Sequence, residues 1–291
     1  MKQALRRWLR RTISPRTLAR ANTIAHADVR FDILEERCRR LAALALREGR
    51  PSLVADPDRE WGLYSQNGED AITLRLLERI GAPHRAFVEI GVEDGLECNS
   101  ALLAFVFGWR GLMLEADEVK CAAARRTLRR LAPQAEARHA FVTAENLNAL
   151  VREANLPEEL GLFSIDVDGV DYWLWKSLDA SRPRLVIVEY NASIPPGESV
   201  SVPYDAAFRS DGFYHGASLA ALEKLAREKG YALAAADAAG VNAFFVRGDL
   251  IDAAGGARTA AECYRPHAAR SLHTAPAAQW ERIRNRPWVR V

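Results

Sequence analysis

Short apolar runs alternate along the chain with stretches in which hydrophobic residues recur every three or four positions. From residue 86 on, the runs have the length and composition of buried strands, and the stretches between them have the period of helices. The predicted strands are 86–91, 111–115, 138–142, 162–166, 185–190, 231–236 and 242–247. The predicted helices are 97–107, 118–131, 145–153, 170–178 and 218–229. This alternation predicts βαβ units, with parallel strands in one sheet and helices on both faces.

The last two predicted strands are separated only by residues 237–241, with Gly240 as a turn residue. A connection this short makes a hairpin, so the final strand should run antiparallel to its neighbour. The predicted fold class is therefore α/β and Rossmann-like, with a mostly parallel seven-stranded sheet and an antiparallel last strand.

The first 60 residues have a different pattern. Residues 2–13 alternate Leu5, Trp8, Leu9 and Ile13 with arginines, and residues 30–47 also have a helical period. The sequence thus predicts a basic helical arm over 1–60, a domain over 61–250 and an extension over 251–291. A basic amphipathic helix can lie on an anionic membrane surface. The alternative is that the arm docks on its own body or on a second subunit of a homo-oligomer.

Composition limits the class of protein. Of 291 residues, 49% are hydrophobic and 27% are charged, which excludes a mainly disordered chain. No stretch approaches the roughly 18 apolar residues of a spanning helix, and residues 1–20 lack the apolar region of a secretory signal. The four cysteines (38, 98, 121 and 263) include no CxxC pair. We expect a reduced, cytoplasmic protein, peripheral at the inner membrane surface where the arm binds lipid.

Charge is unevenly distributed. Residues 1–50 carry 13 Lys+Arg and 5 acids, whereas the whole chain has 40 Lys+Arg and 38 Asp+Glu, so the body is net acidic. An acidic body is a poor match for nucleic acid, and we expect no nucleic-acid partner.

Ligands of such sheets bind at the carboxyl ends of the strands. The first strand leads into Glu89, Gly91 and Gly95, an E-x-G-x-x-x-G pattern with Glu93 where a dinucleotide site would have glycine. Carboxylates in this turn would repel a pyrophosphate and suit a cationic, phosphate-free ligand such as S-adenosylmethionine. The alternative is an ordinary tight turn.

The second and third strands end in further polar residues. Glu115 can accept hydrogen bonds from two ribose hydroxyls, and Asp117 is placed to cap the next helix. Thr143 either meets an adenine ring or forms another helix cap with Asn146. Glu115 and Thr143 therefore join Glu89, Gly91 and Gly95 as predicted cofactor-binding residues.

The densest cluster of acids follows the fourth strand. Asp166, Asp168 and Asp171 lie within six residues, and Glu189 ends the fifth strand. These carboxylates would repel one another unless a sulfonium, a metal ion or an arginine lies near. Asp166 is predicted to face the cofactor, and Asp166, Asp168 and Glu189 together could hold Mg²⁺ or Mn²⁺. In the alternative, Asp171 caps a helix and the others bind backbone amides.

The segments IDVDGVDYWLWKSL and RPRLVIVEYN resemble the FkbM family of S-adenosylmethionine-dependent methyltransferases, which have the class I fold. Asp166, Asp168, Gly169, Asp171 and Glu189 match the family pattern, with Asp in place of the usual Glu at 168 and 171. YSQNGEDAI, at 64–72, is similar to a segment that precedes the first strand in related proteins. The resemblance implies O-methylation of a hydroxyl on a sugar, a cell-surface glycan or a related metabolite.

Methyl transfer to a hydroxyl requires positioning and benefits from a general base. The predicted bases are Asp168, Asp171 and His215. The long segment 192–216 is predicted to be a substrate lid. The residues predicted to bind the acceptor are Gln66, Asn67, Glu69, Tyr204 and Tyr214.

Two other functions compete with this one. Asp166-Val167-Asp168 is a D-x-D sequence, which metal-dependent glycosyltransferases use to bind nucleotide sugars. A methyltransferase-like fold kept only for binding is the second alternative, and the acids at four strand ends argue against it.

Overall fold

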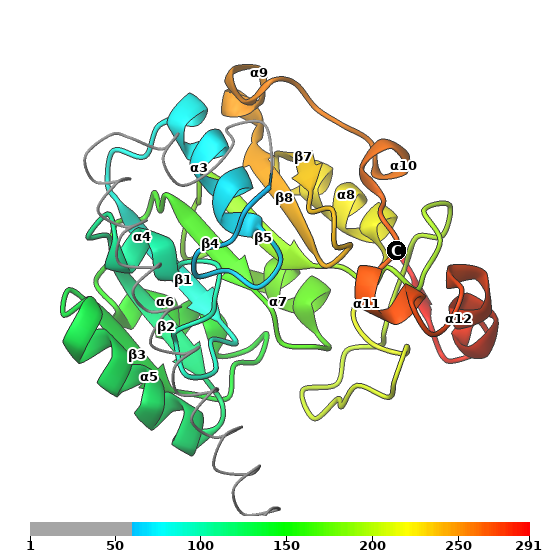
Figure 1. Cartoon of the computed structure of the whole chain (residues 1–291), viewed down its shortest axis with the longest axis horizontal. Helices are drawn as coiled ribbons and strands as arrows, with labels where there is room; N and C mark the ends of the chain where they lie inside the picture. The colour runs from blue at the N-terminus through cyan, green and yellow to red at the C-terminus, as the bar shows by residue number, and fades with distance from the viewer. Residues whose placement is uncertain (1–59) are drawn as a thin grey trace, which may run out of the picture. The chain divides into compact units, whose positions relative to one another are not determined.

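The computed structural model describes residues 60–291 (Figure 1). The described residues belong to one compact unit, Ala55–Val291. The predicted helices at 2–13 and 30–47, and with them the predicted membrane or subunit contact of the arm, lie outside the described residues. Within 60–291, no helix combines the length and the apolar character that crossing a membrane requires.

A seven-stranded sheet forms the centre of the described unit. Its strands are β1 (Ala86–Ile90), β2 (Arg110–Glu115), β3 (Ala135–His139), β4 (Leu162–Ile165), β5 (Leu185–Glu189), β7 (Tyr231–Ala236) and β8 (Asn242–Arg247). The order is β3-β2-β1-β4-β5-β8-β7, and β8 alone runs antiparallel to its neighbours, β5 and β7. The predicted fold class, a mostly parallel seven-stranded sheet with an antiparallel last strand, is confirmed.

The third strand starts three residues earlier than predicted. Residues 135–139 pair with β2, from Gly111↔Ala135 to Glu115↔His139. The apolar residues 140–142 are instead a loop, in which Phe141 is 47% exposed. Because β3 is an edge strand, its sequence is more polar than that of the central strands. The apolar residues 140–142 therefore do not mark its position.

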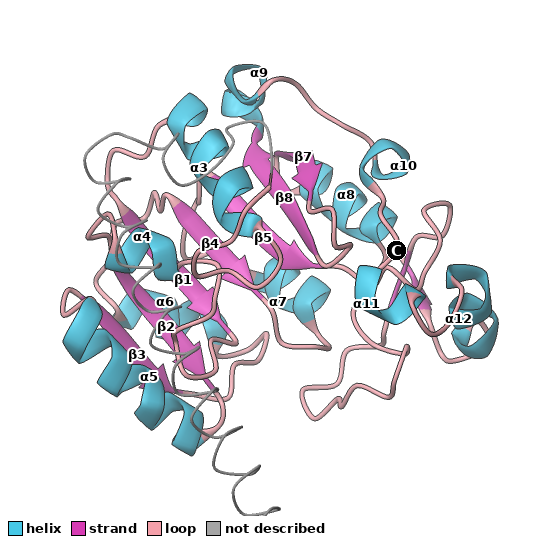
Figure 2. Cartoon of the chain, viewed as in Figure 1, coloured by secondary structure: helices cyan, strands magenta, loops and turns pink. Residues whose placement is uncertain are grey.

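Helices cover both faces of the sheet (Figure 2). Side chains of α6 (Leu147–Glu153), α7 (Asp171–Ser177) and α8 (Leu219–Glu228) share one hydrophobic cluster with the central strands. The helices α3 (Glu69–Ile80), α4 (Ala101–Phe105) and α5 (Glu118–Leu131) pack on the other face. The predicted helix 97–107 is shortened to α4. Residues 97–100 form a turn instead, in which the amides of Asn99 and Ser100 bind the buried Glu89 carboxylate.

The segment 192–216 and the C-terminal residues pack together. Strand β6 (Val200–Ser201) pairs antiparallel with β9 (Val289–Arg290), and Trp280 and Trp288 pack on a cluster that includes Val202 and Tyr214. The last helices are α9 (Ile251–Ala254), α10 (Ala260–Cys263), α11 (Ala268–Ser271) and α12 (Pro276–Ile283). The predicted lid is therefore anchored by a strand pair and an apolar cluster.

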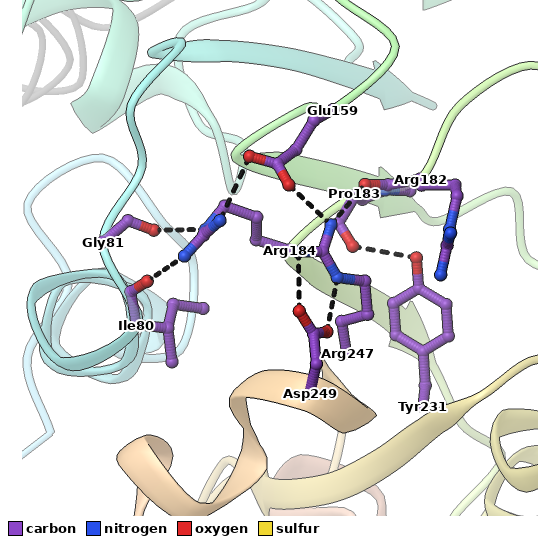
Figure 3. Close-up of polar contacts among 9 residues, drawn as sticks. All are labelled: Ile80, Gly81, Glu159, Arg182, Pro183, Arg184, Tyr231, Arg247 and Asp249. Atoms are coloured by element: carbon purple, nitrogen blue, oxygen red, sulfur yellow. Dashed lines mark hydrogen bonds and ion pairs between the residues drawn. The ribbon is translucent and has the colours of Figure 1, made fainter.

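At the amino ends of the strands, charged side chains are paired (Figure 3). Glu159 accepts hydrogen bonds from Arg184 at 3.1 Å and from Arg247 at 2.8 Å. Arg247 also binds Asp249 at 2.6 Å, and Arg184 donates to the carbonyl groups of Ile80 and Gly81 at the end of α3. These contacts join β5, β8 and α3 through one network.

Candidate functional site

A cavity of about 710 Å³ lies at the carboxyl ends of β1, β2, β4 and β5. Seven of the predicted site residues line it: Gln66, Asn67, Gly91, Glu115, Asp166, Asp168 and Glu189. Eight others do not: Glu69, Glu89, Gly95, Thr143, Asp171, Tyr204, Tyr214 and His215. The predicted positions thus separate into a group that faces the cavity and a group that supports it.

The turn after β1 brings the backbone close to the end of β4. Gly91 has φ 83°, and a Cβ atom there would lie 1.7 Å from the carbonyl oxygen of Asp166. Any other residue would push the two strand ends apart. The neighbouring Glu93 also has a positive φ of 51°. The two glycines of the predicted pattern differ in role, because Gly95 packs against Ala124 of α5 and not on the cavity.

Glu115 is held in place at the end of β2. One carboxylate oxygen accepts a hydrogen bond from the Glu93 amide at 2.8 Å, and the other accepts one from the Asp117 amide at 2.8 Å. Each oxygen keeps capacity for a second donor. Asp117 caps α5, as predicted, through the amides of Val119 and Lys120. Glu115 is therefore an oriented double acceptor on the cavity wall.

Glu89 has a structural role in place of the predicted cofactor contact. Its buried carboxylate accepts hydrogen bonds from the amides of Asn99 and Ser100, each at 2.8 Å, and from the Ser100 hydroxyl. Burial raises its pKa. Thr143 likewise pairs with Asn146 in reciprocal side chain–backbone hydrogen bonds, which is the capping alternative.

Asp171 supports the loop that carries Asp168. Its fully buried carboxylate accepts hydrogen bonds from the amides of Val167 at 2.8 Å and Gly169 at 3.0 Å. Burial raises the pKa of Asp171 to about 6. The loop it holds places Asp168, at φ 54°, on the cavity. Asp171 is thus a support for the site, away from the position predicted for a general base.

Asp166, Asp168 and Glu189 form the acidic cluster at the ends of β4 and β5. No hydrogen-bond donor among residues 60–291 reaches these three carboxylates; the nearest basic atom to Glu189 is His215 Nδ1, 4.0 Å from Oε2. Burial, followed by repulsion from neighbouring carboxylates, raises the pKa values of Asp166 and Glu189 well above the ordinary range. Such a cluster favours a positively charged ligand.

His215 is buried beneath this cluster and does not line the cavity. Its Nε2 atom lies 2.8 Å from an Nη atom of Arg270, and burial together with the nearby arginine lowers its pKa to about 3. Asp168, Glu189 and His215 each offer one atom that could bind a metal ion. These three atoms lie within 4.8 Å of one another, a spacing found in metal sites. His215 takes the place in this group that Asp166 has in the predicted set.

The acceptor side of the cavity differs from the prediction. The Tyr204 hydroxyl donates to Glu145 at 2.6 Å, and the Tyr214 hydroxyl donates to the Pro287 carbonyl at 2.9 Å, so both side chains pack away from the cavity. Phe208 and Arg209 from the same segment line it instead. Phe208 packs so closely on Gly169 that a Cβ there would lie 2.9 Å from the ring.

Glu69 is also separated from the cavity that Gln66 and Asn67 line. Its buried carboxylate binds the Asn67 amide at 2.7 Å and the Asn242 side chain at 2.9 Å. It therefore fixes the loop before α3, much as Asp171 fixes the loop before α7.

Sequence reasoning missed the contribution of the C-terminal segment. His267 and Arg270, at and in α11, line the cavity more than 75 residues after Glu189 along the chain. No motif marks them in the sequence, because only the packing of 251–291 brings them to the strand ends. Phe141, in the loop after β3, also lines the cavity and is not among the predicted site residues, because it falls within the predicted strand 138–142.

Several solved methyltransferase structures resemble this chain at low sequence identity. No family model and no curated protein matches the sequence, so the FkbM resemblance stays a prediction. A magnesium protoporphyrin IX methyltransferase from Synechocystis PCC 6803 with bound S-adenosylmethionine is 13% identical over 62% of this chain and 77% of that one, with a TM-score of 0.40. An O-methyltransferase from Bacillus cereus in complex with S-adenosylhomocysteine is 20% identical over 70% and 89%, with a TM-score of 0.39. A methyltransferase from Geobacter sulfurreducens is 16% identical over 70% and 87%, with a TM-score of 0.40. The fold class follows from this chain's own strand order.

Proposed function

We propose that the chain is an S-adenosylmethionine-dependent methyltransferase that acts on a hydroxyl oxygen. The observation that carries this proposal is Glu115, a carboxylate oriented by two backbone amides at the end of β2, beside the close Gly91 turn. In this position it suits the two hydroxyls of a ribose. The neighbouring carboxylates suit the ammonium and sulfonium charges of the cofactor.

The carboxylates on the cavity wall support methyl transfer to an oxygen atom. The acceptor oxygen attacks the methyl carbon, the carbon–sulfur bond breaks, and its electron pair stays on sulfur. The acceptor's proton passes to a carboxylate at the strand ends. Asp168 and Glu189 both line the cavity and have no hydrogen-bond donor within residues 60–291, so either is available as the base.

For the acceptor, we propose a sugar or glycan hydroxyl. The support is the FkbM resemblance, together with the Phe208 ring and the Gln66 and Asn67 amides on the cavity wall. An aromatic ring can pack on the apolar face of a sugar, and amides can bind its hydroxyls.

Calorimetric titration with S-adenosylhomocysteine tests the function. We expect wild type to bind, and Glu115→Gln to lose about tenfold or more in affinity, since hydrogen bonds to a charged group are worth about 1.5–3 kcal/mol. Glu118→Gln, three residues away and exposed, is the matched control. Thermal melting of both variants checks that they are folded.

Absence of S-adenosylhomocysteine binding by the folded wild type would contradict the proposal. Binding of a nucleotide sugar in the presence of Mn²⁺ would then favour the glycosyltransferase alternative. Screening for acceptors with isotopically labelled S-adenosylmethionine, starting with sugars and glycans, tests the substrate class.

A further inference from the structure

Arg270 and His215 make a contact that the proposed function does not explain. They are 55 residues apart in sequence, and α11 brings the Arg270 guanidinium to 2.8 Å from His215 Nε2. His215 is 1% exposed, so the contact lies inside the protein, directly behind the acidic cluster.

The contact determines which nitrogen of His215 carries the proton. A guanidinium group has only donors, so Nε2 must accept the hydrogen bond and cannot itself be protonated. A neutral imidazole then has its proton on Nδ1. The doubly protonated ring is disfavoured by burial and by the charge of Arg270, which lower the pKa to about 3.

The spacing of Asp168, Glu189 and His215 suits a metal ion, and the position of the His215 proton decides whether these residues can bind one. Nδ1 is the nitrogen that faces Glu189, and a protonated nitrogen has no lone pair to give to a cation. The guanidinium next to the ring adds a positive charge beside the same position. Within residues 60–291 this is the one group of three such residues whose ligand atoms lie within 4.8 Å of one another, and with Nδ1 protonated it does not fit a Mg²⁺ or Mn²⁺ ion, although the distances alone would allow one.

The same proton has a different use. Nδ1 is buried and has no hydrogen-bond partner within the described residues, and Glu189 Oε2 lies 4.0 Å from it. Glu189 is repelled by three carboxylates, those of Asp166 and Asp168 in the loop after β4 and that of Asp171 at the start of α7. The positive charge of Arg270 acts in the opposite direction and lowers the Glu189 pKa.

We infer that Arg270 is a positioning residue, which holds His215 as a neutral Nδ1–H donor directed at Glu189 and thereby makes this cluster a site for the acceptor hydroxyl in place of a metal ion. The second half of this inference rests on the proposed function. There, the acceptor's proton would pass to the Glu189 carboxylate as the oxygen–carbon bond forms and the carbon–sulfur bond breaks. The tautomer and the exclusion of the metal hold for any function of the cavity.

Nitrogen NMR of the histidine rings tests the tautomer without any ligand. In long-range ¹H–¹⁵N spectra of the full chain, His215, assigned through His215→Gln, should show Nδ1–H and an unprotonated Nε2 from about pH 5 to about pH 8. Arg270→Met should convert this pattern to an average of both tautomers. Arg270→Lys, which also has only donors, should restore it.

Arg209→Met is the matched control, because Arg209 also lines the cavity and none of its hydrogen bonds involves His215. Its His215 signals should match those of wild type. An Nε2–H pattern in wild type, or an unchanged pattern in folded Arg270→Met, would overturn the inference.

Titration with Mn²⁺ tests the exclusion of a metal. At equimolar Mn²⁺, the His215 signals of wild type should keep their intensity, because no ion binds within a few ångströms of the ring. Selective broadening of these signals, lost in Glu189→Gln, would overturn the inference and establish a cation site. Neither result depends on S-adenosylhomocysteine binding, so failure of the proposed function would be seen separately.

Discussion

The two ends of the central sheet carry the same kinds of charged residue in opposite states. At the amino ends of the strands, Glu159 and Asp249 are paired with Arg184 and Arg247, and these contacts lower the pKa values of both carboxyls (Figure 3). At the carboxyl ends, no hydrogen-bond donor within residues 60–291 reaches the carboxylates of Asp166 and Glu189, and their pKa values are raised.

The difference in carboxylate pairing indicates a structural role for the amino ends of the strands and a functional role for the carboxyl ends. Paired carboxylates contribute to holding the elements together, since the folded state stabilises their charge. Unpaired, buried carboxylates cost free energy, and they persist where a ligand or a reaction uses them. Substitutions at the two ends should therefore have opposite effects on stability and function.

The largest expected effect is that of Glu189→Gln. If Glu189 takes the acceptor's proton, turnover should fall by about 10²-fold or more, the usual contribution of a general base. The melting temperature should rise, because a repelled carboxylate is removed. Labelled methyl transfer and thermal melting measure the two quantities. Glu97→Gln, an exposed acid on the same cavity, is the control, and wild-type turnover in Glu189→Gln would contradict the assignment.

A second prediction concerns the buried carboxylate beneath the loop that carries Gln66 and Asn67. One oxygen of Asp70 accepts the amides of Leu63, Tyr64 and Ser65, and burial raises its pKa to about 6 from 3.8. Between these values the folded state binds a proton that the unfolded state has released. The free energy of unfolding should therefore fall as pH rises, by up to about 3 kcal/mol from this group.

Denaturant unfolding at about pH 5 and about pH 7.5 measures the upper part of this range, in which the fall should be about 1.4 kcal/mol. In Asp70→Asn, whose side-chain oxygen can still accept the three amides, the fall should be smaller by the contribution of Asp70. The exposed Asp252→Asn should behave as wild type. An identical pH dependence in Asp70→Asn would show that Asp70 is ionised at little cost in the folded protein.

The smallest of the three effects is expected at the amino ends of the strands. Arg247→Met leaves Glu159 with one partner fewer and Asp249 with none among the contacts of Figure 3, and should lower the free energy of unfolding by about 2 kcal/mol. S-adenosylhomocysteine affinity should stay within about twofold of wild type, because this network is at the opposite edge of the sheet. Arg290→Met, which removes the ion pair between the 81%-exposed Arg290 and Glu198, should cost under about 1 kcal/mol. A loss of affinity in Arg247→Met without a loss of stability would contradict the division between the two ends.

Local features of the sequence account for most of the fold and part of the site. Apolar runs and helical periods predict the central strands and most helices, because burial on both faces requires those patterns. The Asp117 cap is also predictable from the sequence, since a helix cap is set by neighbours in the chain. The third strand was misplaced because an edge strand carries a weaker apolar pattern.

The carboxylates at the strand ends show where such reasoning stops. Glu89, Asp171 and Glu69 have the residue type of site acids, yet each is turned inward to bind backbone amides. Asp168 and Glu189 have the same type and face the cavity. Side-chain direction depends on the donors that other segments bring near, and sequence spacing does not contain that information.

The order and character of the elements and the acids at the strand ends follow from residues that are close in sequence, since strand, turn and cap formation are local. The orientation of Glu115 also needs the Glu93 amide, 22 residues away along the chain. The partners of those acids follow from tertiary packing alone. The C-terminal segment brings Arg270 to His215, and Phe208 comes to lie on Gly169. No donor in the described part of the chain comes within hydrogen-bond distance of the Asp166 or Glu189 carboxylate, and the pKa of Glu189 is raised. The reason is physical: hydrogen bonding and charge pairing act over a few ångströms in space, whatever the distance along the chain.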